Sequence, residues 1–161
     1  MNKQTLEYQK TVEAQALAQA ILFPNECDIL MLTTSHFTLQ KHREIFAAIV
    51  QCDDISQTSV RVFLKNIETQ ILMDHICQNV FTATGFADSI IAIESFYEQV
   101  TLYNIVKDTI ANIESGKLVA PNHVVSMIDM LQMKQRSDTL YSPTQAEDAY
   151  LNDMHEKQRR K

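Results

Sequence analysis

The stretch His36–Val50, HFTLQKHREIFAAIV, decides how the first half of this chain folds. Its apolar residues recur every three or four positions, which is the spacing of one helical face. The residues on that face are Leu39, His42, Ile45, Phe46, Ile49 and Val50. Thr38 precedes them and is of a type that favours helix N-caps. We therefore expect an amphipathic helix from Thr38 to about Cys52, with its apolar face in a core.

The composition favours helices throughout. The 161 residues include only two glycines and three prolines, and 45% of them are hydrophobic. Few turn-forming residues and no sustained alternation of polar and apolar residues make a sheet protein a poor fit. We expect an all-α fold, with a compact helical head, a long antiparallel helical hairpin and a separate C-terminal helix.

The head is expected to span residues 1–84, including a loose leader over residues 1–10. Thr11 is the expected cap of a first helix that ends near Leu22, before Phe23–Pro24. A short helix anchored by Ile29, Leu30 and Leu32 should follow. After the helix of the opening stretch, Ser56–Thr58 provides a new cap. Two further helices are expected, one with Val60, Phe63, Leu64 and Ile67, the other with Ile71, Leu72, Ile76 and Val80.

The hairpin is expected over residues 85–136. A helix without a breaker runs from Ala87 to Glu114, and Ser115–Gly116 ends it because glycine suits the left-handed C′ position. Pro121 is placed for the first turn of a return helix, which extends to about Arg136.

The hairpin helices carry apolar residues on more than one side, so they need more than one partner. One interpretation buries all of this surface within one protomer. The interpretation that we favour buries part of it between protomers, in a dimer or larger ring. The expected interface residues are Ile93, Phe96, Val100, Tyr103, Ile110, Met127 and Met130, with Tyr150 and Met154 from the last helix.

The last segment, residues 137–161, predicts a polar helix that resembles a linker. Ser142 and Pro143 give it a serine cap followed by proline in the first turn. The helix buries little apolar surface, so it is either frayed or used to contact a partner. Its end, Lys157–Lys161, is the one basic cluster of the chain.

No pattern in the sequence predicts catalysis. There is no phosphate-binding glycine loop, zinc-ligand spacing or nucleophile motif, so we expect no cofactor, metal or enzyme activity. His42 is expected to hydrogen-bond a neighbouring backbone group. The net charge of −6 makes nucleic-acid binding weak or indirect at most. Three separated cysteines, no signal peptide and no membrane span predict a cytoplasmic protein with reduced thiols.

The opening stretch resembles the N-terminal collar domain of the DnaB-type bacterial replicative helicase. The family pattern D-F-Y-x-x-x-H-R-x-I-F-x-A is matched by Phe37, His42, Arg43, Ile45, Phe46 and Ala48. His36 replaces the family's acid, and Thr38 replaces its tyrosine. The segment Glu13–Leu22 is similar to the family's E-A-E-Q-x-V-L-G-x-I-L opening if one residue is slipped. These departures indicate a distant relative, such as one from a phage or mobile element.

The resemblance implies a non-catalytic interaction and oligomerisation module of DNA replication. In this family a helical head and hairpin pair protomers, and the resulting collar receives primase and responds to loader proteins in the primosome. The motor domain of the helicase has no counterpart in these residues. An alternative is a stand-alone adaptor, loader or inhibitor that binds a host replicative helicase or primase. A nucleic-acid-binding regulator that uses the basic C-terminus is a weaker alternative.

Overall fold

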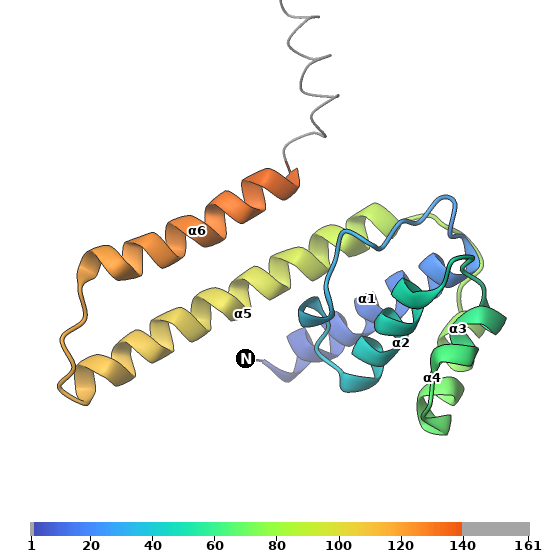
Figure 1. Ribbon diagram of the computed structural model, residues 1–161, viewed down its shortest axis with the longest axis horizontal. Helices are drawn as coiled ribbons and strands as arrows, with labels where there is room; N and C mark the ends of the chain where they lie inside the picture. Colours follow the sequence, from blue (N-terminus) through green and yellow to red (C-terminus); the bar gives the residue numbers. More distant parts are fainter. Residues whose placement is uncertain (1, 140–161) are drawn as a thin grey trace, which may run out of the picture. The chain divides into compact units, whose positions relative to one another are not determined.

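A computed structural model describes residues 2–139 of the chain, with the side chains of residues 2–133. Every regular element in this part is a helix, which confirms the all-α prediction. The elements are α1 (Lys3–Leu22), the 3-10 helix η1 (Thr34–His36), α2 (Gln40–Gln51), α3 (Gln57–Phe63), α4 (Ile67–Gln78), α5 (Phe86–Glu114) and α6 (Pro121–Thr139) (Figure 1). The chain forms two compact units, Met1–Val100 and Thr101–Lys161. We call the first unit the head.

Helix α1 begins much earlier than its sequence predicts. Asn2 caps it, because the Asn2 side chain accepts a hydrogen bond from the backbone N–H of Gln4 at 3.2 Å. The loose leader expected over residues 1–10 is therefore wrong. Gln9 is already buried in this first part of the helix. A buried polar residue gives no apolar periodicity, so the pattern does not reveal these turns.

The head is built around α1, which packs against α2, α3 and α4. Ala16, Leu17 and Ala20 present small or branched side chains that are fully buried. Ile45 and Ile49 of α2 are equally buried, and the rings of Phe37 and Phe46 lie 5.0 Å apart. The rest of the core comes mainly from Val60, Met73, Ile76, Ile90 and Ile93.

The opening stretch forms helix α2, but it starts later and with another cap. Leu39 occupies the N-cap position and makes no side-chain capping bond. Thr38 is not the cap, because its backbone N–H and its hydroxyl both donate to the carboxylate of Glu13, each at 2.5 Å. At the far end Val50 is exposed, so the buried face of α2 is narrower than expected.

The connection from α1 to α2 contains no α-helix. The short helix expected around Ile29–Leu32 is wrong, although Ile29 and Leu32 are buried as anchors. The regular turn comes later, as η1, where the backbone N–H of Thr33 donates to Nδ1 of His36 at 3.0 Å. Short apolar runs bounded by turns do not distinguish a helix from a loop that fills the core.

The first of the two helices after α2 begins at its predicted cap, whereas the boundary between the two helices differs from the prediction. Ser56 caps α3, with its side chain accepting from the backbone N–H of Ser59. Helix α3 ends at Phe63. Asn66 caps α4, because its side chain accepts a hydrogen bond from the backbone N–H of Glu68. Ile67 therefore begins α4 and does not close α3, as the spacing of apolar residues had predicted.

The first part of α5 belongs to the head. Ile90 and Ile93 lie in its core, and Gly85 precedes the helix with a φ of +84°. The side chain of Gln19 holds the preceding loop, donating from Nε2 to the carbonyl oxygens of Thr82 and Thr84 at 3.1 and 2.9 Å. The compact units consequently divide at Val100, whereas the sequence-based division began the hairpin at residue 85.

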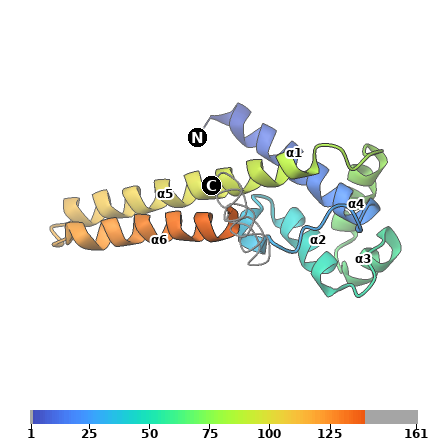
Figure 2. The same cartoon turned by 90° about the horizontal axis from the view of Figure 1, so that it is seen from above.

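The second unit contains the remainder of α5 and helix α6. Helix α5 ends at Glu114, and Gly116 follows with a φ of +78°, the left-handed conformation predicted for it. Helix α6 begins at Pro121 as expected and extends to Thr139, beyond the predicted end. Figure 2 shows α6 running back in the direction opposite to α5. The expected helix from Ser142 onward lies outside the described residues.

None of the helices within residues 2–139 combines the length and the apolar character that crossing a bilayer requires.

The contact between Thr38 and Glu13 predicts a measurable loss of stability. Thr38→Val keeps the shape of the side chain but removes the hydroxyl donor from a fully buried carboxylate. We expect a loss of about 2 kcal/mol in the free energy of unfolding, measured by urea denaturation. Thr58→Val, at an exposed site on α3, is the matched control and should change stability by less than about 0.5 kcal/mol. Equal effects of the two substitutions would contradict this role of Thr38.

Candidate interaction surface

The buried polar side chains of the head contain one set with the composition of a hydrolase triad. Glu13, Thr38 and His42 supply a carboxylate, a hydroxyl and an imidazole, and His42 Nδ1 lies 3.6 Å from Glu13 Oε1. The hydroxyl of Thr38 donates to Glu13 and not to the imidazole. A base cannot activate a hydroxyl whose proton is directed at the acid. Glu13 and His42 are also almost completely buried, so we assign this set to holding the fold.

His42 differs from its expected role. Its Nδ1 is buried without a hydrogen-bond partner, so the predicted bond to a backbone group is wrong for this atom. The neighbouring Arg43 makes the backbone contact instead, donating from Nε to the carbonyl oxygen of Phe37 at 2.8 Å. This bond closes the segment between η1 and α2 onto the helix that follows it.

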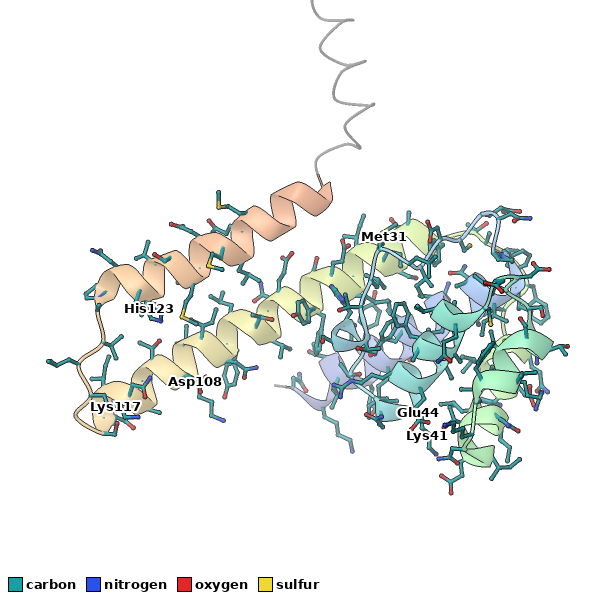
Figure 3. All side chains as sticks on the ribbon, viewed as in Figure 1. Met31, Lys41, Glu44, Asp108, Lys117 and His123 are labelled. Carbon is teal, nitrogen blue, oxygen red and sulfur yellow. The ribbon has the colours of Figure 1, made fainter. Side chains whose placement is uncertain are left out.

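Further charged side chains tie the head helices together. Figure 3 labels Lys41 and Glu44, which both come from α2; Lys41 pairs with Glu68 at 3.0 Å, and Glu44 accepts from the Thr69 hydroxyl at 2.6 Å. Arg61 of α3 pairs with Asp74 of α4. The pKa of Asp74 is lowered mainly by the hydrogen bond from Arg61 and to a smaller degree by the hydrogen bond from Gln57. These contacts join helix to helix and do not surround a binding site.

The described residues contain no group of three or more His, Cys, Asp or Glu side chains that could hold a metal ion. The cysteines are all free thiols in this part of the chain. Burial, and to a smaller degree the charge of Asp74, raises the pKa of Cys77 to about 11. Burial and the nearby Glu26 also raise the pKa of Cys27. A raised pKa disfavours the thiolate, which is the nucleophilic form.

The residues expected at a protein interface fall into four groups in the structure. Ile93 is fully buried in the head core, so it offers no surface to a partner. Phe96 and Val100 are half-buried. The exposed members are Tyr103, Ile110, Met127 and Met130. Tyr150 and Met154 lie outside the described residues.

The exposed apolar residues of the second unit form a stripe on α5. Tyr103 is 61% exposed and Ile110 is 50% exposed; two further exposed residues, Val106 and Ile113, were not among the expected interface residues. We call these four residues the α5 stripe. Their spacing of three, four and three residues places them on one face of the helix. This pair could have been found by continuing the three- and four-residue spacing from Tyr103 and Ile110.

A second face of α5 is partly covered by other residues of the second unit. Ile105 is buried, and Leu102, Thr109 and Asn112 are half-buried. On α6, which Figure 3 marks with His123, the half-buried residues are Val124, Ile128 and Leu131. The α5 stripe lies beside the partly covered face and remains exposed. Met127, Met130 and Met133 are exposed on α6 as well.

The head has an open groove between α1 and α4 that no sequence pattern indicated. Its volume is about 840 Å³, and its apolar floor includes Ala14, Leu72 and Ile76. Phe81 lines it with 82% of its surface exposed. An aromatic side chain exposed in a loop is conspicuous only once the fold places it beside a groove, so the sequence alone gives little signal for it.

Comparisons with known proteins give no family for this chain. No protein-family model matches the sequence, and neither the curated proteins nor the solved structures contain a match. The resemblance to the helicase collar therefore stays a prediction from the residues of the opening stretch and of Glu13–Leu22.

The burial of the cysteines predicts an order of reaction with Ellman's reagent. At about pH 8, near the ordinary pKa of a thiol, the half-buried Cys52 should react first, and Cys27 and Cys77 should react only slowly. Cys52→Ser should remove the fast phase of the reaction. Persistence of a fast phase of the same amplitude in this variant would show that one of the buried thiols is accessible.

Proposed function

We propose that this chain is a non-catalytic protein-interaction and oligomerisation module of DNA replication, resembling the N-terminal domain of the DnaB-type helicase. In this proposal the head is a support, and α5 and α6 form the antiparallel hairpin through which copies pair. The observation that carries the proposal is the exposed α5 stripe.

The α5 stripe has the chemistry of a helix-pairing surface. Ile, Val and Tyr side chains are rarely left exposed in a row on a monomer, and contiguous apolar patches often mark interaction sites. The alternating three- and four-residue steps are those of helices that pack as a coiled coil. Covering the stripe would bury apolar area on both partners, which favours association through the hydrophobic effect.

A second copy of the chain is a suitable partner because the stripe is symmetric in sequence. Tyr103 and Ile113 are each five positions from Asp108, and Val106 and Ile110 are each two positions from it. Antiparallel pairing about a two-fold axis near Asp108 would place Val106 opposite the partner's Ile110. Asp108 itself is on the opposite side of the helix, so the two carboxylates would not meet.

The second candidate is an adaptor, loader or inhibitor that binds a replicative helicase or primase. The observation that favours it is the row of exposed methionines on α6, Met127, Met130 and Met133, of which Met130 is 69% exposed. Methionine side chains are flexible and polarisable, so they adapt to surfaces of different shape. A pull-down with purified helicase and primase would test this candidate.

Self-association is the property that tests the leading proposal. Ile110→Asp puts a charge in the middle of the α5 stripe, and in a two-fold pair it does so twice. We expect this change to weaken association by at least about tenfold, measured by sedimentation equilibrium. Val62→Asp, at an exposed apolar site on α3, should leave association unchanged. A wild-type chain that is monomeric at high micromolar concentration would contradict the proposal, as would equal behaviour of the two variants.

A further inference from the structure

The groove of the head has the length and the two helical walls of a site in which a helix can lie between α1 and α4. Its α1 wall runs from Glu7 to Gln19, which is about 18 Å at the rise of an α-helix. Its other wall is α4 and the loop that follows it, with Leu72, Ile76 and Phe81. A groove that lies between two packed helices and has apolar residues in its lining matches the apolar face of an amphipathic helix of about twelve residues.

The other common peptide modes fit this surface less well. An extended peptide binds by adding a strand to an exposed sheet edge, and residues 2–139 contain no strand. A polyproline segment requires a surface lined with aromatic side chains, whereas Phe81 is the one Phe, Tyr or Trp among the residues that line the groove. An amphipathic helix binds through apolar side chains that need an apolar surface to pack on. Ala14, Leu72 and Ile76 form such a surface in the groove.

Charge indicates which helix the groove would take. Residues 1–100 contain twelve Asp or Glu and six Lys or Arg, whereas residues 101–161 contain eight of each. The net charge of the whole chain therefore resides in the head. Lys10, the one lysine among the groove-lining residues, is bonded to Glu7 at 3.0 Å. An acidic surface attracts a basic partner and repels an acidic one.

We propose that the groove between α1 and α4 binds a basic amphipathic helix of a partner protein. The apolar side of this helix lies over Ala14, Leu72 and Ile76, and the ring of Phe81 closes on it from the loop after α4. Its Lys and Arg residues lie at the borders of the apolar side, where the net negative charge of the head attracts them. This site goes beyond the proposed pairing function, because it uses residues of the head alone and is independent of the α5 stripe.

The probes are two labelled synthetic peptides of about fourteen residues with the same leucines at helical spacing. The polar side carries Lys in one peptide and Glu in the other. Each peptide is titrated with the full chain at moderate salt, and binding is measured by fluorescence anisotropy. We expect the Lys peptide to bind at least about tenfold more tightly than the Glu peptide, with an affinity that decreases as salt is added.

Two substitutions in the groove are paired with two outside it. Phe81→Ala removes the exposed ring, and Thr11→Arg places a long cation in the groove wall; each should weaken binding of the Lys peptide by about tenfold. The matched controls are Val62→Ala and Thr58→Arg, both at exposed sites on α3, and they should bind as the wild type does. All four variants should keep the far-ultraviolet circular dichroism of the wild type.

Three results would overturn the proposal. One is equal binding of the Lys and Glu peptides, which would mean that the acidic head does not select the partner. Another is an equal effect of Thr11→Arg and Thr58→Arg, since binding would then follow net charge and not the groove. The third is unchanged affinity in Phe81→Ala. The Ile110→Asp variant should bind the Lys peptide as the wild type does. Loss of self-association and loss of peptide binding can therefore be told apart.

Discussion

The arrangement of the head depends on the carboxylate of Glu13. This group is fully buried in α1, and both of its oxygens accept hydrogen bonds from Thr38, one from the backbone and one from the hydroxyl. Burying a carboxylate costs free energy unless such donors satisfy it. The two bonds therefore restrict where the backbone before α2 can lie. With that segment fixed, Phe37 and Phe46 meet, and α2 lies against α1.

The closed interior of the head leaves the outer surfaces of the chain for interaction. The polar groups of its interior are used in tying helices together, as in the bonds from Gln19 to the loop before α5 and from Thr69 to Glu44. The exposed apolar residues include the α5 stripe, three methionines of α6 and Phe81 beside the groove. This division between a closed interior and apolar outer faces is typical of interaction modules, and it underlies both proposals.

The parts of the fold that sequence could predict are those with strong local signals. Apolar periodicity marked α2 and α5, Ser56 marked the start of α3, and Gly116 and Pro121 marked the turn between α5 and α6. The missed features depend on contacts between distant residues. Gln9 is buried where the pattern predicted a leader, Thr38 bonds Glu13 and does not cap α2, and Phe81 gains a role only beside the groove. Ile93 was expected at the interface because periodicity does not tell which neighbour covers an apolar face.

The central functional claim is that copies of this chain associate through the α5 stripe. Amide hydrogen exchange of the full chain, at low and at high micromolar concentration, tests it most directly because it locates the surface that association covers. We expect slower exchange at the higher concentration in residues 103–113, no change in α1 to α4, and no such effect in the Ile110→Asp variant. Exchange that is independent of concentration in residues 103–113, or protection confined to the head, would contradict it.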